Sequence, residues 1–131
     1  MKLELPWPPS INKYYSRGRN TVFLRKEVKE YFEAVYYLCY QQKIQKIKGD
    51  IFLTLFLFPP DERRRDIDNL KKAIYDSLQH AGVYNDDRQI KADCSYMCNP
   101  LKNGKVIAIL DQFMLRDEYI KQKLLDYGVE P

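Results

Sequence analysis

An eight-residue apolar run near the middle of the chain constrains the fold more than any other feature. The segment IFLTLFLF, residues 51–58, is rich in β-branched and aromatic side chains, and Gly49-Asp50 and Pro59-Pro60 bound it on either side. A short, continuously apolar strand of this kind is typical of the centre of a sheet that other elements cover. The run therefore predicts a largely buried central strand around which the remaining elements are arranged.

Hydrophobic periodicity predicts the other elements. Apolar side chains at three- and four-residue spacing indicate helices over residues 25–46, 68–81 and 116–127. Strands are expected over residues 3–7, 90–98 and 106–110, with a long polar loop over 10–20. A turn over residues 99–104 would join the last two strands as a hairpin. The order β-α-β-α-β-β-α predicts an α+β fold: a small mixed sheet with helices packed on it.

The chain reads as one domain over residues 1–131. Its 131 residues suffice for one compact core and are too few for two ordinary domains. Apolar residues make up 45% and charged residues 31%, which is typical of a globular chain and excludes a disordered one. No apolar run approaches the ~20 residues of a membrane-spanning helix, and no secretion signal opens the sequence. We therefore expect a cytoplasmic protein without a membrane partner.

Cysteine and histidine usage argues against zinc chemistry. The chain has three cysteines, none in a CxxC pair, and a single histidine, His80. Cys94 and Cys98 lie four residues apart on one predicted strand. We interpret them as reduced thiols, with metal ligation as the alternative.

Positive charge is concentrated in two segments. The net charge of +4 says little by itself, but residues 5–26 contain five basic residues and no acidic one. Basic clusters of this kind suit a phosphate backbone, and solvated loops are the alternative. Trp7 and Tyr14 in the first segment read as core aromatics, with base stacking as the alternative. The predicted DNA-binding residues are Lys13, Arg17, Arg19, Arg63, Arg64 and Arg65.

Two aspartates, Asp66 and Asp68, follow the second basic cluster directly. On a helix, side chains two residues apart point about 200° apart, whereas on an extended chain they share a side. A shared cation is thus feasible if Asp66 lies on extended chain, Asp68 occupies the N-cap of the following helix and Ile67 points inward. The structural alternative is that Asp68 only caps the helix while Arg65 neutralises Asp66.

Further groups follow the aspartate pair in the sequence. Asp86 and Asp87 come after the predicted helix and could approach the pair from their own loop, from the neighbouring strand or across a dimer interface. Mg²⁺ prefers oxygen ligands and keeps several waters, so two or three carboxylates are enough. Lys72, one turn after Asp68, could contact a phosphate, assist an attacking water or form an ion pair with Asp68.

Two ordered motifs resemble the RusA-type Holliday-junction resolvases, the crossover-junction endodeoxyribonucleases. The first is Leu5-Pro6-Trp7-Pro8-Pro9-Ser10-x-Asn12-x-Tyr14-Tyr15. The second is Asp61-x-Arg63-Arg64-Arg65-Asp66-x-Asp68-Asn69-Leu70-x-Lys72-Ala73. Three further fragments continue the second motif in register: Asp76-x-Leu78, Ala81-Gly82 and Asn85-Asp86-Asp87-x-Gln89. The resemblance therefore covers roughly residues 3–111.

The resemblance implies a catalytic site and an activity. The family's metal-binding carboxylates correspond to Asp66, Asp68 and Asp87, and its functional lysine corresponds to Lys72, with Asp86 in a supporting place. It implies an Mg²⁺-dependent homodimer, with Mn²⁺ as a substitute and no nucleotide cofactor. Such an enzyme resolves four-way DNA junctions by paired symmetric nicks, in DNA recombination and repair. Two symmetric nicks require two equivalent sites, which a homodimer supplies.

This chain departs from the family at its C-terminus. Family members end soon after the last strand, whereas here residues 112–131 form an extension whose composition favours ordinary packing. Two other functions remain open at this point. One is a metal-dependent nuclease acting on flaps or other branched nucleic acid, which only substrate tests would separate. The other is a non-catalytic DNA-binding module, although such a module gains nothing from carboxylates beside phosphates.

Overall fold

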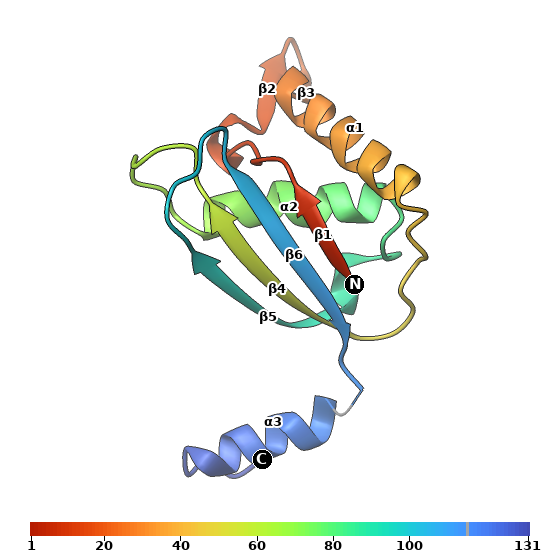
Figure 1. Ribbon diagram of the computed structural model, residues 1–131, viewed down its shortest axis with the longest axis vertical. Coiled ribbons are helices and arrows are strands. Elements are labelled where there is room, and N and C mark those ends of the chain that lie inside the picture. Colours follow the sequence, from red (N-terminus) through yellow and green to blue (C-terminus); the bar gives the residue numbers. More distant parts are fainter. Residues whose placement is uncertain (115) are drawn as a thin grey trace.

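A four-stranded mixed sheet forms the centre of the protein. The computed structural model describes residues 1–114 and 116–131. The sheet has the strand order β1-β6-β4-β5, with bounds Lys2–Leu5 for β1, Ile51–Phe58 for β4, Ile90–Met97 for β5 and Lys105–Gln112 for β6 (Figure 1). Strand β4 pairs in parallel with β5 and antiparallel with β6, and β1 pairs antiparallel with β6. Because β4 has a partner on each side, the predicted central strand is confirmed.

The expected hairpin between the last two strands of the sheet is wrong, since β4 lies between β5 and β6. The chain leaving β5 instead crosses the end of β4, where the Cys98 N–H donates to the Leu57 carbonyl at 2.8 Å. Gly104, with φ 65°, then turns the chain into β6. The turn residues predict a reversal of the chain. They do not determine which strand becomes the partner, because that depends on long-range packing.

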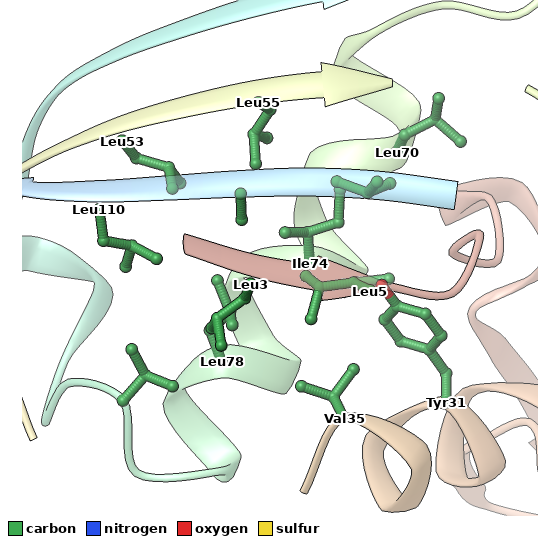
Figure 2. Packing of buried hydrophobic residues seen from close by; sticks show 14 of the residues in the cluster. Leu3, Leu5, Tyr31, Val35, Leu53, Leu55, Leu70, Ile74, Leu78 and Leu110 are labelled. Carbon is green, nitrogen blue, oxygen red and sulfur yellow. The ribbon is translucent and has the colours of Figure 1, made fainter. Parts of the chain in front are cut away.

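Two helices cover one face of the sheet. Helix α1 spans Lys26–Gln41 and helix α2 spans Asp68–His80. Figure 2 shows the contact layer, in which leucines of the strands face Val35 of α1 and Ile74 and Leu78 of α2. These three side chains are 0% exposed, and burying an aliphatic side chain of this size stabilises the fold by roughly 1.5–3 kcal/mol. The α+β class and the core positions of both helices are confirmed.

Helix α1 ends earlier than its apolar pattern predicts. The pattern continues through Ile44 and Ile47, but Lys43 adopts φ 52° and ends the helix there. Its backbone N–H bonds to the Tyr40 carbonyl, and the Ile44 N–H bonds to the Cys39 carbonyl, as at a left-handed helix C-terminus. Ile44 and Ile47 still pack against the core, although from irregular chain. The apolar pattern thus reflects burial of these side chains, which continues beyond the end of the helix.

A second, two-stranded sheet occupies part of the predicted polar loop. Strand β2, Tyr15–Gly18, pairs antiparallel with β3, Thr21–Leu24, and Asn20 in the connecting turn has φ 61°. Two-residue hairpin turns require such positive φ values. The element order therefore contains a hairpin before α1 that the sequence prediction lacks. The segment shows little apolar alternation because most of the hairpin is exposed, so periodicity gave no signal for it.

The other face of the sheet carries no helix among the described residues. In β4, Leu53 and Leu55 are fully buried under the helices, whereas Phe52 and Phe56 face the other way and are half-buried. Phe56 stacks on Tyr96 of β5, with ring centroids 5.3 Å apart. The predicted central strand is therefore largely buried, although the described helices cover only one of its faces. We call the other the open face; its apolar members are Phe52, Phe56, Tyr96, Ile107 and Ile109.

The C-terminal helix α3, Arg116–Asp126, projects away from the sheet (Figure 1). It contains no buried residue, so its side chains do not enter the core of this chain as those of α1 and α2 do. Its attachment consists of Tyr119 against Phe113, at 5.5 Å between ring centroids, and Arg116 near Asp50 at 3.5 Å. None of the described helices is both long enough and apolar enough to cross a membrane.

Candidate active site

The aspartate pair lies at the end of the loop that connects β4 to α2. Asp66 is on non-helical chain, and its carbonyl accepts the Asn69 N–H at 3.2 Å. Asp68 is the first residue of the helix, while Ile67 occupies the N-cap position with a helical backbone and makes no side-chain cap. The expectation that Asp68 caps the helix is therefore wrong. Ile67 packs against the core, which confirms its inward direction and leaves both carboxylates exposed.

Neither carboxylate of the pair is engaged. Within the described ranges, no donor hydrogen-bonds to the side chain of Asp66 or Asp68, and no cation pairs with either. Arg65, the expected partner of Asp66, instead bonds to Asp61 at 2.8 Å. The Arg63 N–H and this guanidinium hold the pKa of Asp61 below its usual value, against a smaller opposing effect of burial. The two purely structural alternatives for the pair are thus both absent.

The Asp86-Asp87 turn gives its two acids different environments. Asp86 caps the short helix Asp87–Gln89: its side chain accepts the Arg88 N–H at 2.9 Å, while the Gln89 side chain bonds back to the Asp86 N–H. The Asp87 backbone N–H donates to the Gln79 side chain at 3.1 Å, which fixes the turn against α2. The Asp87 carboxylate itself stays exposed. Asp86 therefore has a capping role, and Asp87 presents the more exposed acid.

Asp87 lies beside α2, where its backbone N–H bonds to Gln79 and it lines a pocket together with Tyr75. Burial raises the pKa of Asp87 first, and the carboxylates of Asp86 and Asp76 raise it further, while the ammonium of Lys72 lowers it. Tyr75, which lies on α2, is affected by the charge of Asp87 and by that of Asp68. Its pKa is raised by burial, then by Asp93, and then by the charges of both Asp87 and Asp68. Asp68 and Asp87 thus lie within electrostatic reach of one side chain.

The three predicted metal ligands do not converge on a single point. In residues 1–114 and 116–131, no group of three or more acidic, histidine or cysteine side chains is close enough to hold a metal ion. The donor chemistry nevertheless fits Mg²⁺, since exposed carboxylates are its usual protein ligands and one or two of them, with waters, are sufficient. The residues that could hold the ion are Asp66, Asp68 and Asp87.

Lys72 bonds to Asp76 at 3.2 Å and makes no ion pair with Asp68. Its ammonium also lies 5.2 Å from the centre of the Tyr14 ring. Burial lowers the pKa of Lys72, but the carboxylate of Asp76 and the hydroxyl of Tyr15 raise it more, so the ammonium form is favoured. Tyr14 is 1% exposed, which confirms it as a core aromatic.

A cavity of ≈ 490 Å³ connects the two motifs. The N-terminal segment contributes Trp7 and Asn12 to its lining, and the acidic segment contributes Arg64, Asp66 and Asn69. Sequence reasoning singled out neither asparagine as functional. Their only signal was membership of the two motifs, because an amide side chain carries no charge pattern. The cavity brings a carboxylate, a guanidinium and two amides onto one concave surface.

The predicted basic residues fall into three environments. Arg64 lines the cavity, and the Arg63 side chain is 84% exposed. The Arg65 side chain is only 18% exposed, and it bonds to the Asp61 side chain and to the backbone carbonyls of Asp61 and Arg63. Arg65 therefore braces the loop. The remaining three are exposed and lie on the short helix Ile11–Lys13, on β2 and in the hairpin turn: Lys13, Arg17 and Arg19.

An acidic site set between exposed arginines on a compact α+β domain defines an enzyme that acts on a phosphodiester backbone. The family model described as Endodeoxyribonuclease RusA matches residues 6–109. The chain belongs to this family of endodeoxyribonucleases, as the two motifs indicated. Helix α3 lies outside the matched residues.

Three relatives illustrate the similarity. The crossover junction endodeoxyribonuclease RusA of Enterobacteria phage HK97 is 38% identical over 91 residues, which cover 65% of this chain and 72% of the relative. The protein of the same name from Shigella sonnei strain Ss046 is 35% identical over 89 residues, covering 67% and 74%. That of Enterobacteria phage 82 is 36% identical over 97 residues, with the same coverage.

Proposed function

We propose that the protein is an Mg²⁺-dependent endodeoxyribonuclease that resolves four-way DNA junctions by paired symmetric nicks, in recombination and repair. The observation that carries this proposal is that some acidic side chains near the site have bonding partners and others do not. Within the described residues, Asp66 and Asp68 present unengaged carboxylates and Asp87 presents an exposed one. The nearby acids Asp61, Asp76, Asp86 and Asp93 are bound by cations or backbone donors. Leaving exposed carboxylates unpaired beside arginines has no structural purpose. Relatives named crossover junction endodeoxyribonucleases support the substrate.

These three exposed acids would hold Mg²⁺, or Mn²⁺ in its place. Once bound, the ion supplies charge stabilisation at the scissile phosphate and lowers the pKa of a bound water. Asp66 lies in the wall of the cavity, Asp68 begins α2 and Asp87 lies beside that helix. The Lys72 ammonium acts electrostatically on Asp87, and it places positive charge beside the site where the phosphate would lie.

The exposed cations bind the DNA backbone around this site. Arg64 lines the same cavity as Asp66, and Arg63 is exposed in the same loop. The hairpin β2–β3, which carries Arg17, projects from the N-terminal segment (Figure 1). Contacts to phosphates position a duplex arm without reading its bases, which suits recognition of a branched structure. The DNA-binding set we propose is Lys13, Arg17, Arg19, Arg63, Arg64 and Arg65, the last acting mainly by bracing the loop.

A homodimer formed through the open face would supply the two sites that paired nicks require. The open face carries the stacked pair Phe56 and Tyr96, and Tyr96 is 51% exposed. Its apolar side chains share the face with charged residues at its borders: Lys2, Glu4, Lys105 and Asp111. An apolar centre with a polar rim is typical of a protein–protein interface. A self-complementary face brings two copies together about a twofold axis, and that symmetry makes the two sites equivalent.

Substrate comparison tests the proposed function. The purified protein is incubated with a synthetic four-way junction, a flap and a linear duplex, in Mg²⁺ and in EDTA. We expect paired nicks in opposed strands of the junction, in Mg²⁺ only, with little cutting of the duplex. Equal cutting of flap and junction would contradict junction resolution. Cleavage in EDTA would contradict the metal requirement.

A further inference from the structure

Two side chains that are distant from each other in the sequence, Tyr14 and Lys72, meet at one carboxylate oxygen of Asp76. The Tyr14 hydroxyl donates to Oδ2 of Asp76 at 2.5 Å, and Nζ of Lys72 lies 3.2 Å from the same oxygen. Tyr14 belongs to the N-terminal motif, whereas Lys72 and Asp76 are one turn apart on α2. Hydrogen bonds to an ionised carboxylate are stronger than neutral ones. This cluster therefore connects the N-terminal motif to the helix that carries Lys72.

The backbone around Tyr14 holds its side chain in place. The Tyr14 N–H donates to the Ile11 carbonyl at 3.2 Å, and the Tyr14 carbonyl accepts the Arg25 N–H at 3.0 Å. The side chain itself is almost fully buried. The Asp76 carboxylate thus has a partner whose ring is held in the core.

Lys72 has two acidic neighbours at equivalent distances along the helix. Asp68 lies one turn before it and Asp76 one turn after it. On an isolated helix, the pair with the acid N-terminal to the lysine is the more favourable one, which would be Asp68 with Lys72. The structure has the opposite pair, and the Asp68 carboxylate is free of cations within the described residues. The buried Tyr14 hydroxyl, present only at Asp76, accounts for the reversal.

We propose that Asp76 is a positioning residue. Together with Tyr14 it holds the Lys72 ammonium one turn away from Asp68, so that the Asp68 carboxylate stays available to a divalent cation while the lysine remains beside Asp87. The role rests on the proposed function, because it concerns the acid and the lysine assigned to that activity. Nothing in the positioning requires Asp76 to touch DNA or metal.

The proposal predicts a suppression pattern that a purely structural residue would not give. Asp76→Asn keeps the size of the side chain but releases the lysine, which then pairs with Asp68. We expect Mn²⁺ affinity, measured directly by electron paramagnetic resonance without DNA, to fall at least fivefold. Adding Lys72→Met removes the competing ammonium and should restore the affinity to within twofold of wild type. Continued weak binding in the double variant would overturn the proposal.

Single-turnover cleavage of a four-way junction gives a second readout. Asp76→Asn should slow cleavage about tenfold, with junction affinity within twofold of wild type. If Asp76 acts only through Lys72, the double variant should be no slower than Lys72→Met alone. Multiplied rate losses in the double variant would show an independent structural effect and overturn the positioning role.

A second variant and the wild-type protein complete the test. Tyr14→Phe keeps the buried ring and removes only the hydroxyl, so it should weaken Mn²⁺ binding in the same direction, again with recovery on adding Lys72→Met. This variant decides the question if Asp76→Asn does not fold. A wild-type protein that neither binds Mn²⁺ nor cuts the junction would overturn the proposed function itself. Normal wild-type behaviour without the suppression pattern would overturn only the role of Asp76.

Discussion

The guanidinium of Arg65 lies 5.6 Å from the centre of the Trp7 ring, and this contact joins two motifs that are 58 residues apart in the sequence. The same guanidinium pairs with Asp61 and bonds to two backbone carbonyls of its own loop. One partly buried cation thus holds Trp7, in the wall of the cavity, against the loop that leads to Asp66. Arg65 shapes the site from beneath, whereas Arg63 and Arg64 present their charges to solvent.

Removing this brace should destabilise the protein. For Arg65→Ala we expect a loss of about 1–2 kcal/mol in the free energy of unfolding, because the ion pair is partly buried and its hydrogen bonds are charge-assisted. Urea denaturation measures the change. Arg63→Ala is the matched control: its side chain is 84% exposed, so its effect should stay within about 0.5 kcal/mol. Equal stability of the two variants would contradict the bracing role.

The charges of the N-terminal segment should act on every DNA equally. Replacing Lys13, Arg17 and Arg19 together by glutamine should weaken binding to all DNA arms and make the log–log salt dependence shallower by roughly 0.9 for each phosphate that is no longer neutralised. Cut-site preference should not change, because phosphate contacts carry no base information. The control replaces Lys29, Lys43 and Lys48, which are exposed outside both basic segments. An unchanged salt slope in the first variant would show that the segment is solvated surface.

The open face should control assembly. The wild-type protein is expected to sediment at twice 15.7 kDa. Tyr96→Glu places a charge on the open face at the edge strand β5, so it should give a folded monomer that no longer makes paired nicks. Tyr40→Glu on α1 is the control, since that residue is 70% exposed and lies outside the open face. A Tyr96→Glu protein that remains dimeric would contradict the location of the dimer interface on the open face.

The sequence predicted the elements that have a strong local signal. The run at 51–58 has sharp turns at both ends, and the apolar stripe of α2 is complete, so both were placed with nearly correct bounds. Hairpin β2–β3 was missed because an exposed hairpin needs no apolar alternation. The pairing of β6 with β4 was missed because strand order depends on contacts between residues far apart in the sequence.

For the candidate site, too, the sequence predicted the features that depend on local spacing and missed those that depend on long-range contacts. The local spacing singled out Asp66, Asp68 and Lys72, and the resemblance to the family added Asp87 to the set. They did not identify the acid with which Lys72 pairs. That choice depends on Tyr14, which reaches α2 only in the folded chain. Likewise, the bracing role of Arg65 depends on Trp7 and could not be distinguished from DNA binding by charge alone.

Cleavage of a four-way junction by Asp68→Asn tests the central claim most directly. The substitution preserves the shape of the side chain and removes the charge of an exposed, unpaired carboxylate, so stability should stay within about 0.5 kcal/mol of wild type. Cleavage in Mg²⁺ should fall at least a hundredfold, while junction binding persists or tightens. Asp117→Asn on α3, whose side chain is 85% exposed, is the control and should cut normally. Wild-type cleavage by Asp68→Asn would contradict the assignment of the free carboxylates to catalysis.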